Sequence, residues 1–244
     1  KEVYFFRIAG EGYPLYKNGK LYILSHDRMS LGSVGTMGEI RFKRDFSTII
    51  TSFDAGQHLV AVGLLNGKTQ LISAEGKEEA TLVAQEEKRP VYGVAVSPRE
   101  EMVAVLWGDG PQHLSLFRSN GEGFDETVRF TEEKALLHEA MVSFSEDSTL
   151  LFYQVPSGVM FVDLQNGAKQ LVEVEGELFD LYCRSAGESV LIVGNRGEGG
   201  FFNVYNSSGE VVTEETTLEP MRSFYATDDR VIYTSGNTAV CVEG

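Results

Sequence analysis

The chain repeats one pattern six times: an apolar strand, a short polar turn, a second apolar strand, a Gly-bearing turn and a third strand. The clearest copy runs from Val91 to Ser119, where VYGVAVS, MVAVLWG and HLSLFRS are separated by PREE and DGPQ. Such runs are short, rich in β-branched and aromatic residues, and bounded by turn residues, which is typical of strands rather than helices. The pattern therefore predicts an all-β protein built from one repeated unit.

The spacing of the copies narrows this prediction. One anchor residue can be chosen in the second strand of each copy, and successive anchors lie 38 to 48 residues apart. The anchors are Leu24, Val62, Val105, Tyr153, Val193 and Thr234. A repeat of about forty residues is the signature of a β-propeller, in which each repeat forms one blade. Asn-Gly and Asp-Gly pairs such as Asn66-Gly67 suit the tight hairpin turns of an antiparallel meander.

The strand count predicts how the ring closes. Each middle copy supplies a fourth strand, whereas the last copy supplies three and a spare strand, Val3–Ile8, precedes the first copy. Because an open sheet edge is costly, Val3–Ile8 is expected to become the outer strand of the last blade. We therefore predict a single domain over residues 1–244, a six-bladed propeller of four-stranded antiparallel blades. The expected blades are 13–46, 47–86, 91–132, 139–175, 178–217 and 221–244, the last one completed by residues 3–8.

The ends of the third strands carry a family resemblance. LISAEGK, LFRSNGE, FVDLQNG and VYNSSGE each hold an apolar pair, a polar residue and a Gly-bearing turn, and Ser97–Glu101 and Ser145–Ser148 form Ser-initiated turns between first and second strands. These features resemble WD-repeat propellers and their bacterial quinoprotein-like relatives. The Trp-Asp dipeptide and the Gly-His start of WD repeats are absent. The hydrogen-bonded network that marks true WD repeats is therefore not expected.

Charge and composition limit the partners. A formal net charge of −15 disfavours binding to phosphate backbones and anionic lipid, and no apolar run approaches the ~20 residues of a membrane helix. We expect a soluble monomeric domain with a protein or peptide partner, no nucleic acid and no membrane insertion. The chain opens at Lys1 rather than Met, as after removal of a leader or in a segment of a longer chain. An extracytoplasmic, periplasmic location is favoured over the cytoplasm.

A search for catalytic or metal-binding patterns predicts none. His26, His58, His113 and His138 lack metal-type spacing, and the chain has no G-x-S-x-G motif. The Gly-rich segment 194–200 lies between two strands, where a wide hairpin loop is expected rather than a phosphate-binding turn before a helix. Cys183 and Cys241 are expected to be buried free thiols. No catalytic residue, cofactor site or metal site is therefore predicted.

Candidate binding residues lie in loops that emerge at one end of the predicted propeller, because loops leaving second strands and loops entering first strands share that end. They are Arg28, Tyr92, Trp107, Arg196 and Arg222. Trp, Tyr and Arg are enriched in interface hot spots. For Trp107, however, packing between blades is the favoured interpretation and an exposed anchor is the alternative. The favoured function is a non-catalytic protein-recognition module or scaffold. A channel-based ligand-binding or hydrolytic propeller and a structural domain of a larger envelope or scaffold protein remain alternatives.

Deleting residues 1–8 should expose a sheet edge in the last blade. We expect the melting temperature to fall by about 5 °C or more, or the protein to aggregate, because an unpaired strand edge costs several kcal/mol and invites association. Thermal unfolding followed by circular dichroism checks this, with light scattering as the readout for association. An unchanged melting temperature would show that Val3–Ile8 does not complete the last blade.

Overall fold

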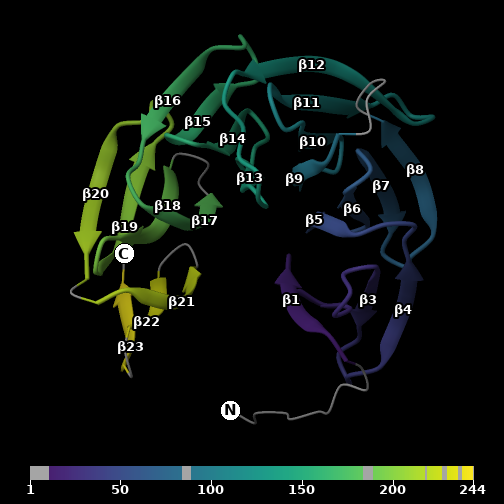
Figure 1. The fold of residues 1–244 in the computed structure, drawn as a ribbon, viewed down its shortest axis with the longest axis horizontal. Helices are drawn as coiled ribbons and strands as arrows, with labels where there is room; N and C mark the ends of the chain where they lie inside the picture. Colours follow the sequence, from purple (N-terminus) through teal and green to yellow (C-terminus); the bar gives the residue numbers. More distant parts are fainter. Residues whose placement is uncertain are drawn as a thin grey trace. The chain divides into compact units, whose positions relative to one another are not determined.

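The computed structural model describes residues 11–83, 89–183, 189–217, 219–226, 230–235 and 238–243. Over these residues the regular structure consists of strands, arranged in six antiparallel sheets that each follow chain order (Figure 1). Five sheets have four strands and the last has three, which confirms the predicted six-bladed propeller. The predicted closing strand Val3–Ile8 lies outside the described residues.

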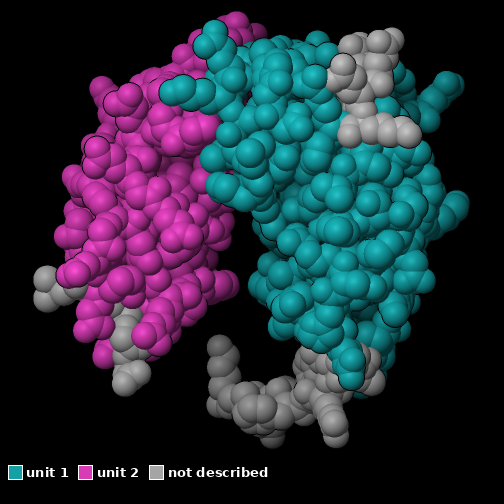
Figure 2. All heavy atoms as spheres, in the orientation of Figure 1, with its two compact units in different colours: residues 1–140 teal, residues 141–244 magenta. Residues whose placement is uncertain are grey.

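The chain divides into two compact units, residues 1–140 and 141–244, coloured separately in Figure 2. Unit 1 contains three four-stranded sheets. The first is β1 (Tyr13–Lys17), β2 (Lys20–Leu24), β3 (Ser30–Val34) and β4 (Ile40–Asp45). The second is β5 (Ile50–Ala55), β6 (Leu59–Leu64), β7 (Lys68–Ser73) and β8 (Glu78–Val83). The third is β9 (Val91–Val96), β10 (Met102–Trp107), β11 (Gln112–Ser119) and β12 (Phe124–Glu132).

Unit 2 contains the other three sheets. The first is β13 (Val142–Phe144), β14 (Leu150–Val155), β15 (Gly158–Asp163) and β16 (Lys169–Glu173). The second is β17 (Glu177–Cys183), β18 (Ser189–Arg196), β19 (Gly199–Asn206) and β20 (Val211–Thr216). The third is β21 (Met221–Ala226), β22 (Arg230–Ser235) and β23 (Thr238–Glu243).

The second strand of the middle sheet in each unit is apolar on both faces because neighbouring sheets of the same unit cover both. Strand β6 is buried along its whole length. Val60 and Val62 join the apolar cluster shared with β1–β4, whereas Leu59 and Ala61 join the cluster shared with β9–β12. In contrast, every residue of the outer strand β20 is exposed. The continuous apolar runs of β6 and β18 are therefore strands that lie between two sheets of their own unit.

A Ser-initiated turn recurs three times, at Ser25–Arg28, Ser97–Glu100 and Ser145–Ser148. In each, the fourth residue has a left-handed φ of 57° to 61° and its N–H donates to the carbonyl of the Ser. Each Ser Oγ accepts the backbone N–H of the residue five positions later. The side chain of the left-handed fourth residue points away from the turn. In two of the three turns, at Arg28 and Glu100, it reaches an adjacent sheet.

Glu100 uses this turn to join two sheets of unit 1. Its Oε1 accepts the backbone N–H groups of His58 at 2.6 Å and Leu59 at 3.1 Å, at the turn between β5 and β6. A Cβ added to Gly56 would collide with this carboxylate, so the close approach requires glycine. Along the inner strands, Ser52 and Asp54 of β5 accept the N–H groups of Val94 and Val96 of β9. Side chains thus satisfy backbone donors across the sheet boundary.

The prediction of two buried free thiols is confirmed only in part. Both cysteines are free, and Cys183 is partly buried beside the Ser143 hydroxyl, so burial raises the pKa of its thiol to about 12. Cys241 is exposed, so its predicted burial is wrong. Cys241 lies on β23, the third and outermost described strand of its sheet. A third strand is buried only where a fourth strand or a neighbouring sheet covers it.

Replacing Glu100 with Ala should weaken the junction between the second and third sheets. We expect a loss of about 1–2 kcal/mol in the free energy of unfolding, because two backbone N–H groups lose a charged acceptor. Chemical denaturation measures this. Glu101→Ala is the matched control at the next, exposed position and should change stability by less than about 0.5 kcal/mol. Equal losses in the two variants would contradict a specific junction.

Candidate functional site

The first strands of four sheets share a β-bulge at the end where the strand begins. The bulged residues, which the pairing register skips, are Thr51, Tyr92, Phe179 and Arg222. A bulge turns a side chain away from the regular alternation of the strand, and bulges are over-represented beside binding sites. Tyr92 and Arg222 were predicted as candidate residues, whereas Thr51 and the exposed Phe179 were missed. The register shift that singles them out has no sequence signature in these strands.

In unit 1 the structure brings Arg28 and Tyr92 to one linked set of loops. Arg28 Nη2 reaches the carbonyl oxygen of the bulged Thr51 and a carboxylate oxygen of Glu139, each at 3.5 Å. The next residue, Ala140, donates its N–H to the carbonyl of the bulged Tyr92 at 2.7 Å. Burial, together with the negative charge of Asp109, raises the pKa of the Tyr92 hydroxyl above its usual range. Tyr92 therefore stays neutral at physiological pH.

Exposed apolar side chains follow the same loops. The exposed fractions of Met29, Ile49 and Leu65 are 37%, 40% and 42%, and that of Leu137 is 68%. Backbone hydrogen bonds hold the loops together: Phe46 N–H donates to the Met29 carbonyl and Leu65 N–H donates to the Ile49 carbonyl. We call this surface of unit 1 the loop face. Its residues are Arg28, Met29, Ile49, Leu65, Tyr92, Leu137 and Glu139.

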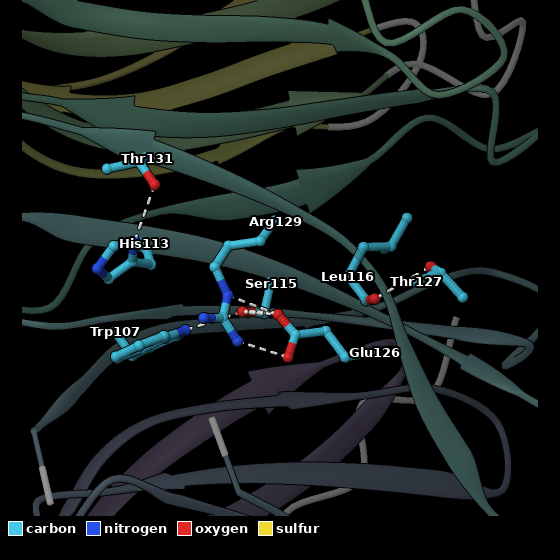
Figure 3. Close-up of polar contacts among 8 residues, drawn as sticks. All are labelled: Trp107, His113, Ser115, Leu116, Glu126, Thr127, Arg129 and Thr131. Carbon is cyan, nitrogen blue, oxygen red and sulfur yellow. Dashed lines mark hydrogen bonds and ion pairs between the residues drawn. The ribbon is translucent and has the colours of Figure 1, made fainter. Parts of the chain in front are cut away.

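Trp107 does not belong to the loop face, because it is a core residue with 5% of its surface exposed. Figure 3 shows its indole Nε1–H donating to Ser115 Oγ at 2.9 Å, and that hydroxyl donating to Glu126 Oε1 at 2.8 Å. Arg129 makes two bonds to the Glu126 carboxylate, at 2.7 and 2.6 Å, and lies 5.2 Å from the indole ring centre. The structure thus supports the packing interpretation of Trp107 and not the exposed anchor. The reason is that β10, which carries it, is buried along its whole length, and Trp107 packs in the apolar cluster shared with the second sheet.

The network of Trp107, Ser115, Glu126 and Arg129 joins three strands of one sheet, β10, β11 and β12. The sequence offered no motif for it. His113 extends it, because its ring lies 4.5 Å from the indole ring and its Nδ1 contacts Thr131 Oγ1 at 3.0 Å. Burial lowers the pKa of His113, and the positive charges of Arg129 and Arg89 lower it further. The imidazole is therefore held in its neutral form.

In unit 2 the candidate residues Arg196 and Arg222 are both exposed. Arg196 Nε donates to the Glu175 carbonyl at 3.1 Å, and its guanidinium lies 5.2 Å from the Phe201 ring centre. The neighbouring Asn195 side chain bonds both backbone groups of Met221, directly before Arg222. This pair of bonds connects the β18–β19 turn to the start of β21. The turn itself is tight, with Arg196 paired to Gly199, so the predicted wide loop is wrong.

Among the described residues, no group of three or more His, Cys, Asp or Glu side chains is placed to hold a metal ion. The same part of the chain contains no helix long and apolar enough to cross a membrane.

Comparison with known proteins identifies the family. The profile of a family described as "beta-propeller protein" matches residues 3–241. The chain belongs to the β-propeller family. Its sequence matches no curated protein of known function.

Solved structures similar to this propeller have low sequence identity to it. The Myceliophteria thermophila Cps50 (Swd1) β-propeller domain is 14% identical with a TM-score of 0.69, over 97% of this chain and 84% of that one. BamB from Moraxella catarrhalis is 12% identical with a TM-score of 0.61, over 93% and 70%. A chain in the mitotic checkpoint complex is 11% identical with a TM-score of 0.70, over 93% and 75%. At these identities the likeness concerns the fold.

The lowered pKa of His113 predicts an acid-sensitive contribution to stability. The folded state disfavours the charged imidazole, so this contribution is complete above the unfolded value of about 6.5 and is lost as pH falls through the lower folded value. Trp107 is the only Trp, its ring lies 4.5 Å from that of His113, and a protonated imidazole quenches an adjacent indole. We therefore expect the stability of the wild type to fall below pH 6.5, and its native fluorescence to fall at the lower pH at which the folded imidazole becomes charged.

His113→Gln is the comparison that isolates this residue. The variant should lose less stability between pH 6.5 and 5 than the wild type, and its fluorescence should stay nearly flat over that range. Carboxylates that titrate in the same range contribute equally to both proteins. Parallel pH profiles for the two proteins would show that His113 does not titrate in contact with Trp107.

Proposed function

We propose that this β-propeller is a non-catalytic protein-recognition module that docks a protein or peptide partner on the loop face. The observation that carries the proposal is the row formed by Met29, Ile49 and Leu65, which are exposed on loops that backbone hydrogen bonds join to one another and to Arg28. Contiguous apolar surface with a polar surround marks interaction sites in soluble proteins. Tyr and Arg are the side chains that most often supply the strongest contacts at such sites.

Rigidity supports the same function. The loops of this face are short and joined by backbone hydrogen bonds. They are flanked by strands of unit 1, of which β6 and β10 are buried along their whole length. A partner therefore loses little affinity to ordering the propeller's own loops on docking. Trp107 serves in this proposal as a scaffold residue that holds the third sheet. In unit 2, Phe179, Arg196 and Arg222 offer the same types of contact side chain and are proposed to contribute to recognition.

The similar structures are consistent with a docking role. One is a chain of the mitotic checkpoint complex, so propellers of this fold take part in protein assemblies. Their low identity to this chain means that the choice of partner must come from the loop residues rather than from the fold.

Glutamate substitutions on the apolar row test the proposal. We expect Met29→Glu with Leu65→Glu to lower partner affinity at least tenfold, because two charges would have to be desolvated in the interface. The measurement is affinity capture from cells of the source organism, with the recovered protein then tested by titration. Met37→Glu is the matched control, since Met37 is 82% exposed in the turn between β3 and β4 at the other end of its sheet.

A different pattern would relocate the interface. Exposed acidic residues outside the loop face include Glu75, Glu79 and Glu122. If neutralising these three releases the partner while Met29→Glu with Leu65→Glu does not, the loop-face proposal is wrong and the partner is a basic protein. Turnover of any substrate by the purified propeller would contradict the non-catalytic part of the proposal.

A further inference from the structure

We infer that the loop face binds an acidic peptide segment of its partner, whose carboxylate displaces Glu139 from Arg28 while neighbouring apolar side chains cover Met29, Ile49 and Leu65. This inference rests on the proposed function and specifies the chemistry of the partner. It concerns unit 1 alone.

The backbone at Arg28 is fixed by its turn. Arg28 occupies the left-handed fourth position of the Ser25 turn, with φ of 57°, and its N–H donates to the Ser25 carbonyl at 2.8 Å. Asp27 braces the turn by accepting the Met29 N–H at 2.9 Å. From this position Nη2 reaches the Thr51 carbonyl at 3.5 Å. The turn therefore fixes the point from which the Arg28 side chain extends toward Thr51 and Glu139.

Glu139 occupies Arg28 only weakly. The single contact between them is 3.5 Å long, and their side chains remain 41% and 56% exposed. Elsewhere in the same unit, the partly buried Arg129 and Glu126 make two bonds of 2.6 and 2.7 Å, the length expected of a fully engaged pair. An exposed pair like that of Arg28 and Glu139 contributes a factor of about five at most to an equilibrium. An incoming carboxylate can thus replace Glu139 at little cost and bind Arg28 in two-pronged geometry.

Apolar surface next to Arg28 specifies the rest of the segment. Met29 follows Arg28 directly, and Ile50 N–H donates to the Arg28 carbonyl at 2.8 Å, which places Ile49 beside it. Leu65 adjoins Ile49 through its own backbone bond. A segment with an acidic side chain among Leu- or Met-like residues therefore matches the face in charge and in apolar area. A purely acidic segment would leave the apolar row uncovered.

The overall charge works against an acidic partner only at long range. The net charge of −15 slows the encounter, but its field is screened beyond about 8 Å at physiological ionic strength. The contact with Arg28 forms within that distance. The chain's own Glu139 shows that a carboxylate is accepted there.

The test uses the full chain and three pools of labelled peptides, nine residues long, with blocked ends. The pools share alternating Leu and Met positions and differ only in carrying Glu, Gln or Lys between them. Fluorescence anisotropy measures binding to the wild type and to variants whose folding is confirmed by thermal unfolding. We expect the Glu pool to bind about tenfold more tightly than the Gln pool, the effect of one charged hydrogen-bonded contact.

The variants distinguish displacement of Glu139 from a general attraction between the peptide's charge and the protein. Glu139→Gln should tighten binding of the Glu pool about threefold by removing the internal competitor. Arg28→Gln should abolish the preference for Glu over Gln. Arg41 and Glu39 form the matched control pair, because they are exposed and 3.9 Å apart outside the loop face. Arg41→Gln and Glu39→Gln should leave binding of all pools unchanged.

Each contrary result has a distinct meaning. If Arg28→Gln keeps the preference for Glu, if the Lys pool binds best, or if no pool binds, the inference is wrong. If the pools bind without a preference for Glu and Met29→Glu with Leu65→Glu abolishes binding, the proposed loop-face function stands and the acidic partner does not. If binding of the pools is insensitive to Met29→Glu with Leu65→Glu, the proposed function fails with the inference.

Discussion

Burial of both faces of the middle sheets is the constraint on which the rest of the structure depends. In unit 1 the sheet β5–β8 packs through Val60 and Val62 on one side and through Leu59 and Ala61 on the other. In unit 2 the sheet β17–β20 does the same, with Ile192 on one side and Leu191 on the other. Apolar area buried in this way is the main favourable term in folding. This packing restricts which residues the inner strands can carry. Exposed and polar side chains are therefore found mainly in turns, on outer strands and at the ends of first strands.

Several polar side chains inside this packing are matched by hydrogen-bond partners. Ser52 and Asp54 accept backbone N–H groups of the next inner strand, and Glu100 does so across a turn. The Trp107 indole reaches a hydroxyl whose own proton goes to the Glu126 carboxylate. An unmatched donor in such a place would cost about 1–3 kcal/mol. These contacts therefore also favour one alignment of neighbouring sheets over others.

Two Arg–Glu pairs in unit 1 show how geometry separates structure from recognition. Arg129 and Glu126 are joined by two short bonds beside a buried indole, so each charge is already paired within the fold. Arg28 and Glu139 share one long, exposed contact on a surface of apolar side chains. The first pair suits a fixed scaffold. The second suits a site where a partner's carboxylate can compete, and the bulges at Thr51 and Tyr92 help to form that site.

Local patterns in the sequence determined the elements of this protein. The apolar runs and Gly-bearing turns predicted six antiparallel sheets, and the Ser97 and Ser145 turns were recognisable from their residues, because strand period and left-handed turn positions depend on neighbours a few residues away. Tertiary structure alone decided the rest. It buried Trp107, exposed Cys241, and joined Arg28 to Glu139 across 111 positions of the chain. The physical reason is that side-chain exposure, bulge position and distant ion pairs depend on how neighbouring sheets pack. The residues of one strand do not specify which other segments pack against it.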